Sequence, residues 1–222
     1  MTVLHLADEG EAADLAAFLS RLLHYDRGAA VRLQAAGTAL AVFGRPPSFD
    51  VLAIRAVRLA KPYENGLDVT LDVTVSAGEL LEAVDETGAT ALVPGAVTGP
   101  PWAGVLPPRG GWRPVPGLPA SEALRAMVGA GVAEFRARTG ELAEERRTRA
   151  ELDRIGREIW SRTVGDTHLP VRAVHAAQSL GFLRAAGELA LLSSGAWLRL
   201  RTPYGSIAVR RAGLGALDVS VR

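Results

Sequence analysis

Apolar residues recur with helical spacing early in the chain. Leucine and phenylalanine occupy positions i, i+3, i+4, i+7 and i+8 of one stretch, and this spacing places them on a single face of a helix. These positions are Leu15, Phe18, Leu19, Leu22 and Leu23. Asp8 lies three residues before Glu11, an approximate capping box that predicts where the helix begins. We therefore expect an amphipathic helix over Glu9–Tyr25.

Alternating apolar and polar residues follow this helix and predict strands. The clearest run is Leu67–Val75, where aliphatic residues alternate with aspartate and threonine. Such alternation gives a sheet one buried and one exposed face, which is typical of antiparallel sheets. Ser76 and Glu79 form a second capping box and predict a short helix after this strand. The other strands expected in this part are Thr2–Leu6, Ala30–Ala35, Thr38–Arg45, Phe49–Ala60 and Ala89–Val93.

The segment Ser121–Thr163 has a helical pattern with a strongly charged middle. Its apolar residues recur at heptad-like spacing, but Gly, Arg and Glu interrupt the seam too often for a coiled coil. Oppositely charged residues four positions apart, such as Arg154 and Glu158, favour a helix that water surrounds. Gly140 is the weakest helical position. We expect one long or mildly broken helix, with two helices bent apart at Thr139–Gly140 as the alternative.

The chain beyond Pro170 predicts one more helix and then a β-hairpin. The apolar residues of 170–183 fall on one helical face, and Pro170 suits the first turn of a helix. Turn residues at Ser194–Gly195 and at 203–205 separate the strands that follow. The expected strands are Glu188–Leu192, Ala196–Thr202, Ser206–Arg211 and a last one at Ala216–Val221.

Together these elements predict an α+β fold: a mainly antiparallel sheet with helices on one face, a long central helix and a C-terminal helix-plus-β-hairpin unit. The order strand–helix–strand–strand–strand near the N-terminus resembles the repeating unit of replication sliding clamps, an analogy of fold without a sequence motif. The expected division is an α+β domain at 1–98, a loop rich in Pro, Gly and Trp at 99–119, a helical connector at 120–164 and a small basic unit at 165–222. The pattern leaves open whether the basic unit packs as one domain with residues 1–98.

Composition indicates a globular chain whose charge is unevenly distributed. Of 222 residues, 48% are hydrophobic and 22% are charged, and the net charge is +1. From His168 to the last residue, however, seven arginines face only Glu188 and Asp218, a net charge of +5. A basic segment of this kind suggests an anionic partner. No apolar run approaches the ~18 residues of a membrane span, and no basic leader precedes Asp8, so we expect a cytoplasmic protein without a membrane partner.

Motifs for catalysis, metal binding and cofactor binding are missing from the sequence. There is no G-x-S-x-G elbow, no Walker A run and no H-E-x-x-H. The chain has no cysteine and therefore forms neither a disulfide framework nor a thiolate metal site. His168 and His175 would lie about 10 Å apart along a helix, too far for one metal ion. We expect no catalytic residue, no metal and no cofactor, which favours a protein that is not an enzyme.

The C-terminal arginines suggest the preferred function. A helix followed by a protruding hairpin has the order of a winged-helix unit, and guanidinium groups fit phosphate oxygens well. We therefore expect a non-enzymatic binding or regulatory protein that contacts nucleic acid or an acidic protein surface through this unit. The expected contact residues are Arg172, Arg199, Arg201, Tyr204, Arg210 and Arg211. In the structural alternative, these strands complete a sheet and the arginines solvate its edge.

Two other functions remain open. A small-molecule-binding protein or an enzyme would have its pocket beneath the loop of Trp102 and Trp112, with Arg109 and Arg113 holding an anionic group. A structural protein would instead use the apolar positions of the central helix to form a homodimer.

Overall fold

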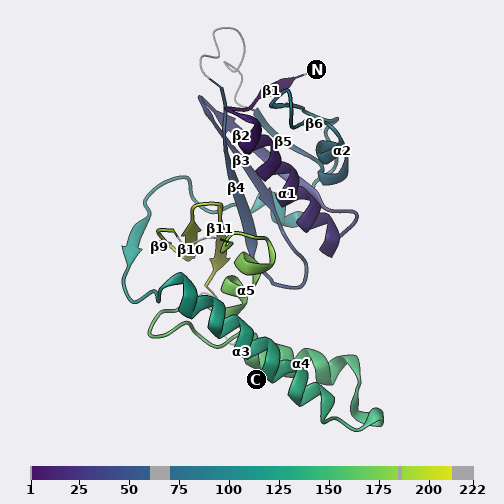
Figure 1. Cartoon of the computed structure of the whole chain (residues 1–222), viewed down its shortest axis with the longest axis vertical. Coiled ribbons are helices and arrows are strands. Elements are labelled where there is room, and N and C mark those ends of the chain that lie inside the picture. Colours follow the sequence, from purple (N-terminus) through teal and green to yellow (C-terminus); the bar gives the residue numbers. More distant parts are fainter. Residues whose placement is uncertain (1, 61–70, 185–186, 212–222) are drawn as a thin grey trace, which may run out of the picture.

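The computed structural model describes residues 2–60, 71–184 and 187–211. Two parts of the predicted strands, residues 67–70 and 216–221, lie outside the described residues. Figure 1 shows a large sheet with helices packed against it and a pair of helices that projects from one end. The predicted α+β fold with antiparallel sheets is confirmed.

One antiparallel sheet of eight strands, in the order β5-β2-β3-β4-β11-β10-β9-β8, forms the body of the molecule. The four strands on one side come from the N-terminal part of the chain and the four on the other side from the C-terminal part. Strands β4 and β11 pair and join the two sets. On each side three strands consecutive in sequence lead away from this pair to an edge strand, which is β5 on one side and β8 on the other. The eight strands are β2 (Ala30–Ala36), β3 (Ala39–Gly44), β4 (Leu52–Arg58), β5 (Leu71–Ser76), β8 (Arg113–Val115), β9 (Ala190–Ser194), β10 (Trp197–Thr202) and β11 (Gly205–Arg210).

Short elements at the N-terminal end complete the described strands. A three-stranded sheet has the order β1-β7-β6, formed by β1 (Val3–His5), β6 (Val84–Asp85) and β7 (Thr90–Leu92). The predicted short helix after β5 is present as α2 (Ala77–Glu82), and β6 begins two residues after its end, at Val84. The carbonyl of Ala83, the residue between them, accepts a hydrogen bond from the Leu92 N–H at 3.1 Å. The chain therefore turns from helix to strand within one residue.

Helices cover one face of the large sheet. Helix α1 (Glu9–Tyr25) has the predicted bounds and packs on β4, and Asp8 caps it by accepting a 2.9 Å hydrogen bond from the Glu11 N–H. Helix α5 (Val171–Ser179) packs on β11 in the corresponding position of the other half. The main core lies between these helices and the sheet, where fully buried side chains such as Phe18, Leu33 and Leu200 meet. Apolar burial of this kind is the dominant stabilising term of a fold.

The expectation of one long helix through 121–163 is wrong, because the chain reverses after Gly140. Helix α3 (Ser121–Gly140) and helix α4 (Arg149–Trp160) lie antiparallel, separated by a 3-10 turn, η2 (Glu144–Arg146). The guanidinium of Arg147 closes the reversal by donating to the carbonyls of Gly140, at 2.9 Å, and Leu142, at 3.0 Å. The alternative with two helices and a break near Gly140 is therefore the correct one.

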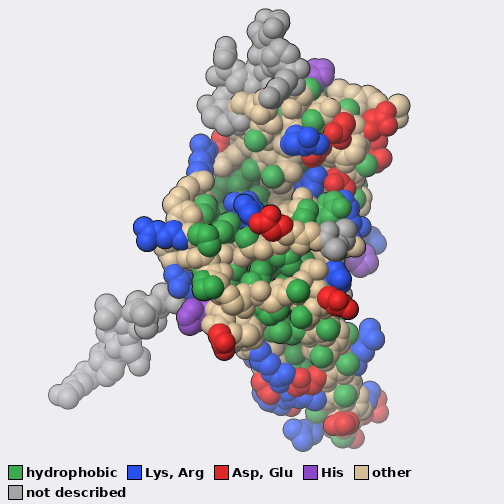
Figure 2. All heavy atoms as spheres, turned by 60° about the vertical axis from the view of Figure 1, so that its left-hand side comes forward, with side chains coloured by type: hydrophobic (Ala, Val, Ile, Leu, Met, Phe, Trp, Pro, Cys, Tyr) green, Lys and Arg blue, Asp and Glu red, His purple; other side chains and the backbone are tan. Residues whose placement is uncertain are grey.

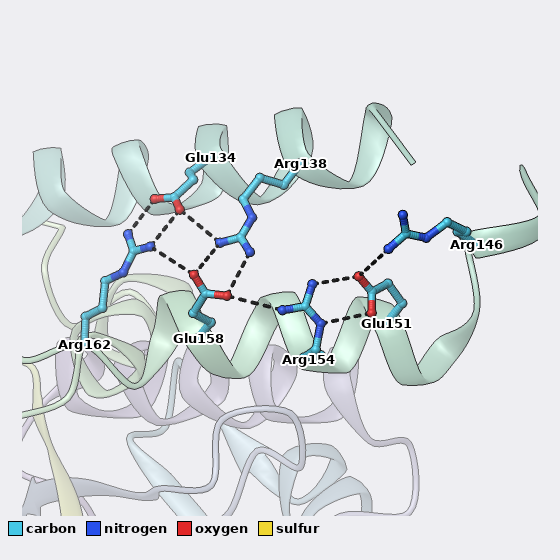
Figure 3. A network of polar contacts seen from close by, with 7 residues as sticks. All are labelled: Glu134, Arg138, Arg146, Glu151, Arg154, Glu158 and Arg162. Atoms are coloured by element: carbon cyan, nitrogen blue, oxygen red, sulfur yellow. Dashed lines mark hydrogen bonds and ion pairs between the residues drawn. The ribbon is translucent and has the colours of Figure 1, made fainter. Parts of the chain in front are cut away.

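Ion pairs join the two helices of this helical hairpin (Figure 3). Arg162 binds Glu134 at 2.5 Å, and Arg138 binds Glu158 with two hydrogen bonds of 2.8 Å. The chain of contacts continues along α4, where Arg154 binds both Glu151, at 2.7 Å, and Glu158, at 3.5 Å. Each arginine of this network therefore has a carboxylate of the chain as its partner.

Two further expectations are corrected by the sheet itself. Residues 99–119 are not only a loop, because they contain the 3-10 turn η1 (Pro101–Gly104) and the edge strand β8, which pairs with β9. An edge strand tolerates Pro114, which lacks a backbone N–H. The hairpin of β10 and β11 does not protrude as a wing, since β10 also pairs with β9 and β11 with β4. It is an interior part of the sheet.

Candidate anion-binding site

Three of the predicted contact residues converge on one cavity. Arg172, Arg210 and Arg211 line a cavity of about 600 Å³ at the end of the large sheet, beside the N-terminal end of α5. We call it the arginine pocket. Its floor is apolar, with the buried side chains of Leu198 and Val209. A cavity of this size is within the usual range for small ligands, roughly 300–1,000 Å³.

Separate segments bring these arginines together. Arg172 lies in the first turn of α5, two residues after the buried Pro170, which is the N-cap of the helix. Arg210 is the last residue of β11, and the Arg211 N–H donates to the Ala196 carbonyl at 2.7 Å. One guanidinium nitrogen of Arg211 also donates to the Gly195 carbonyl at 2.6 Å, which holds this side chain to the β9–β10 turn. Within the described residues, no hydrogen bond engages the remaining N–H groups of its fork.

The charge of the arginine pocket is not compensated within the described part of the chain. None of the ten residues that line it is acidic, and among the described residues Arg172, Arg210 and Arg211 form no ion pair. The Nε atom of Arg172 is buried and has no hydrogen-bond partner within the same residues. A buried donor without a partner is costly unless a ligand or water satisfies it. The N-terminal end of α5 adds partial positive charge on the same side.

Other polar groups in the pocket were not predicted as contacts. His168 lines it beside the hydroxyl groups of Ser161 and Thr163, all three on exposed residues between α4 and α5. Hydroxyl and imidazole N–H groups can donate to the same oxygens that a guanidinium binds. No spacing in the sequence links these residues to Arg210, because the fold alone brings the α4–α5 connection beside the end of β11.

Arg199 and Arg201 lie away from the pocket, on the sheet face opposite the main core. Arg199 is half-buried, and its guanidinium carbon lies 5.8 Å from the centre of the Trp112 ring. Burial, together with the nearby positive charge of Arg201, lowers the pKa of Arg199 from its ordinary value. Arg201 is exposed and lies 3.9 Å from a carboxylate oxygen of Glu188. The predicted contact residues therefore divide into two groups.

Tyr204 is placed at the junction of the two halves of the sheet. Its ring lies 3.8 Å beneath the guanidinium of Arg184, and its carbonyl accepts a 2.8 Å hydrogen bond from Arg55. The Arg55 side chain is only 6% exposed and also binds Glu11 of α1 at 2.9 Å. Tyr204 therefore packs between elements of the chain, and the arginine pocket does not include it.

The loop residues of the alternative pocket are only partly brought together. Trp102 lines a cavity of about 380 Å³ together with Trp197, but Trp112, Arg109 and Arg113 do not line it. The indole N–H of Trp112 donates to the carbonyl of Pro108 at 3.0 Å, a contact within its own loop. A pocket that Trp102 shares with Trp112, Arg109 and Arg113 stays a prediction.

The apolar positions of the central helices are mostly used inside the chain. Leu124, Val128, Ile155 and Ile159 are at most 2% exposed, because α3 and α4 pack on each other and on α5. The homodimer through this segment stays a prediction. Within the described ranges, no group of three or more His, Asp or Glu residues is placed to hold a metal ion. None of the helices described is both long and apolar enough to cross a membrane.

Figure 2 brings forward the side of the molecule that carries β8, β9 and β10. Apolar side chains occupy much of the middle of this side, and basic side chains lie among them and along the margin. Acidic side chains concentrate instead at the upper end and at the helical hairpin, where basic side chains accompany them.

Family comparisons divide the chain into two parts of similar length. Residues 1–104 match a family described as a domain of unknown function (DUF8010), and residues 107–214 match another described in the same way (DUF8185). The two matches meet between η1 and β8. No curated protein matches the sequence.

Solved structures of sliding clamps are similar to this chain in fold. A β clamp of H. pylori in complex with 5-chloroisatin is 10% identical, with a TM-score of 0.50, and the match covers 98% of this chain and 65% of that one. A DNA polymerase sliding clamp from Pseudomonas aeruginosa is 12% identical, with a TM-score of 0.49. The match covers 98% of this chain and 66% of that one. The chain therefore spans about 65% of the length of these clamps. At such identities the likeness concerns the fold alone.

Proposed function

We propose that this chain is a non-enzymatic binding protein that holds phosphate groups of a nucleic acid in the arginine pocket. Three arginines line one cavity beside the N-terminal end of a helix, and this combination is suited to phosphate oxygens. Phosphate contacts supply most of the affinity of proteins that bind nucleic acids without strong sequence preference.

The observation that carries this proposal is that, among the described residues, no carboxylate compensates the positive charge of the arginine pocket. Arg172, Arg210 and Arg211 gather without any carboxylate in the pocket lining, although the chain as a whole has 24 acidic residues. Like charges held together raise the energy of the free protein, and an anion that enters relieves this repulsion. The unpartnered Nε of Arg172 adds a donor that such an anion can satisfy.

Nucleic acid suits the pocket better than an acidic protein surface does. A phosphodiester strand presents oxygens that protrude from its backbone and can enter a concave site. Carboxylates on a folded partner lie on a convex surface, where they reach a cavity of about 600 Å³ less readily. The hydroxyl groups of Ser161 and Thr163 add the type of phosphate contact that nucleic-acid interfaces commonly contain.

The test is binding of labelled oligonucleotides at low ionic strength, measured by fluorescence anisotropy. We expect the wild-type chain to bind, and the triple variant Arg172→Gln, Arg210→Gln and Arg211→Gln to bind at least about 30-fold more weakly, since each charge-assisted contact is worth roughly 1.5–3 kcal/mol. Glutamine keeps much of the side-chain length, so Tm and the circular dichroism spectrum should be retained.

A matched control removes the same charge elsewhere. Arg27, Arg136 and Arg149 are exposed and line neither the arginine pocket nor the Trp102 cavity. Changing all three to Gln should weaken binding by no more than about 3-fold, the effect of net charge alone. Equal losses in both triple variants, or no binding by the wild-type chain at 20 °C in low salt, would sink the proposal.

A further inference from the structure

A second cavity lies next to the arginine pocket and has a different chemistry. Its volume is about 380 Å³, and the two indole rings of Trp102 and Trp197 line it above an apolar floor that includes Leu52 and Ala208. Both tryptophans are only partly buried, and both pack against the small apolar cluster beneath the cavity. We call it the tryptophan pocket. Partly exposed aromatic side chains of this kind bind flat, apolar groups.

One residue belongs to both cavities. Arg210 lines the arginine pocket and the tryptophan pocket alike. Trp197 lies directly opposite Arg210 in the pairing of β10 with β11, a position where side chains on the same sheet face are about 5 Å apart at Cβ. Ala196, the residue before Trp197, lines the arginine pocket. The floor of the arginine pocket belongs to the main core, and the floor of the tryptophan pocket belongs to the smaller cluster on the other sheet face. The two cavities therefore lie on opposite faces of the sheet and adjoin at the common end of these two strands.

The rim of the tryptophan pocket does not repel an anion. Its one carboxylate, Asp50, is paired with Arg45 at 2.7 Å, and both residues are exposed. Arg210 forms no ion pair within the described part of the chain. A group that enters this cavity thus meets two indole rings and one uncompensated guanidinium.

This juxtaposition selects a class of ligand. An unpaired nucleotide has a flat base that is joined to a phosphate through the sugar. Proteins bind unpaired strands by stacking the bases on aromatic side chains and by contacting the phosphate backbone with arginines. The bases of a duplex are covered by pairing and stacking and cannot enter a cavity without being flipped out. A phosphate without a base has no flat group that could stack on the indole rings.

We infer that the chain binds single-stranded nucleic acid, with a base in the tryptophan pocket and the adjoining phosphates at Arg210 and in the arginine pocket. This inference rests on the proposed function and narrows its ligand to an unpaired strand. Base stacking is tolerant of sequence, so the preference is for unpaired bases and not for a particular motif.

The experiment compares ligands of equal charge. The probes are a thymidine oligonucleotide, an abasic oligonucleotide with the same number of phosphates, and a duplex, each titrated into the full chain at one salt concentration. We expect the thymidine strand to bind about 5-fold to 100-fold more tightly than the abasic strand, the range that one stacked base provides. The duplex should resemble the abasic strand. A uridine strand and thymidine monophosphate complete the set.

Variants of the tryptophan pocket then identify the source of this preference. Trp197→Leu and Trp102→Leu should remove most of the difference between thymidine and abasic strands and leave abasic binding unchanged. Trp197→Phe keeps an aromatic face and should restore the preference, which separates lost stacking from lost folding. Trp112→Leu, at an indole outside both pockets, is the matched control and should bind as the wild-type chain does.

The outcomes separate the two levels of the proposal. If no ligand binds, the proposed function fails and the inference fails with it. If thymidine, abasic and duplex probes bind equally and only the arginine variants weaken binding, the proposed function stands and the inference is overturned. Retained base preference in Trp197→Leu, or monophosphate binding as tight as that of the strand, would overturn it as well. Similar affinities for thymidine and uridine strands are expected, because stacking does not require the 2′-hydroxyl.

Discussion

Arginine side chains occur both in the helical hairpin and in the arginine pocket, but only those of the hairpin are shown to pair with carboxylates among the described residues. In the hairpin, Arg138 and Arg162 bind Glu158 and Glu134 across α3 and α4, and these contacts lower the pKa of both carboxyl groups and raise the pKa of both guanidinium groups (Figure 3). In the pocket, Arg172 and its neighbours form no ion pair within the described residues.

The difference between arginines with and without carboxylate partners indicates which surface of an arginine-rich chain remains available to a partner. Counting charges gives the same value to every arginine, but a guanidinium already bound to two carboxylate oxygens has little left for a phosphate. The hairpin arginines fasten two helices together, and exposed pairs of this kind contribute modestly to stability. Within the described residues the pocket arginines form no such ion pair, and this contrast is the reason for the binding role that we propose for them.

Reversal of the pocket charges should have the largest effect. The double variant Arg210→Glu with Arg211→Glu is expected to weaken oligonucleotide binding by more than about 100-fold, because two charge-assisted contacts are lost and two repulsions gained. Both residues are exposed, so Tm should change by only a few degrees. Fluorescence anisotropy and thermal melting measure the two effects.

The same reversal on the hairpin is the comparison for this prediction. Arg136 of α3 and Arg149 of α4 are exposed, and changing both to Glu gives an identical change in net charge. We expect affinity to fall by no more than about 5-fold through long-range repulsion. If both double variants lose binding to the same extent, net charge decides and the pocket has no special role.

Packing between α3 and α4 should show the opposite profile, a loss of stability without a loss of binding. A Cβ atom on Gly131 would lie 2.8 Å from the Trp160 ring, whereas one on Gly129 would meet nothing within 4 Å. Gly131→Ala should therefore unfold with a free energy about 1–3 kcal/mol lower than Gly129→Ala, the cost of overpacking. Urea denaturation of the two variants measures the difference. Equal stabilities would mean that the helices do not meet at Gly131.

Loss of one carboxylate in the hairpin should have a smaller effect that depends on pH. Glu158→Gln removes one of the two carboxylate partners of Arg138 and also the contacts of Glu158 with Arg154 and Arg162. We expect a fall in Tm at pH 7 smaller than that of Gly131→Ala. Arg138 lowers the pKa of Glu158 in the folded state, so this stabilisation is present above the usual carboxyl pKa and is lost as the pH falls through the lowered one. Melting curves of both proteins should approach each other below pH 4. A constant difference down to pH 2 would contradict the assigned pairing.

Substitution of His175 should have the smallest effect of these changes, a difference in how Tm depends on pH. Its ring lies between Phe49, at 5.0 Å, and Trp160, at 4.4 Å between ring centres, and burial lowers its pKa. The unfolded chain therefore takes up a proton near pH 6.5 that the folded chain resists, and stability is lost as the pH falls below that value. The Tm of the wild-type chain should decrease more between pH 7.5 and 5.5 than that of His175→Gln. Parallel decreases would place the titration elsewhere.

The sequence predicted those elements whose pattern is local. Helix α1 has strong 3.6-residue periodicity and a cap at Asp8, and its bounds were predicted correctly. The reversal after Gly140 was only an alternative, because contacts such as Arg138 with Glu158 join residues on different helices and leave no trace in local spacing. Strand β8 was missed since three residues containing Pro114 carry no alternation.

The candidate site was predictable in part for the same reason. The basic C-terminal segment identified Arg172, Arg210 and Arg211, but it grouped them with Arg199 and Tyr204, which the fold places elsewhere. Strand parity separates Arg199 from the buried Leu198 and Leu200 of the core, but it does not separate Arg199 from Arg210, which lies opposite Trp197 on the same sheet face. His168 and Ser161 could not be found, because only the tertiary structure brings them to the end of β11.

The most direct measurement of the central claim is the salt dependence of single-strand binding by the wild-type chain and by the Arg172→Gln, Arg210→Gln and Arg211→Gln variant. Each phosphate that a cation neutralises on a single strand contributes about 0.7 to the slope of log Kd against log salt concentration. Three contacts in the arginine pocket predict that the slope of the variant is lower by about 2. Equal slopes for the two proteins would contradict the account, because the pocket arginines would then contact no phosphate.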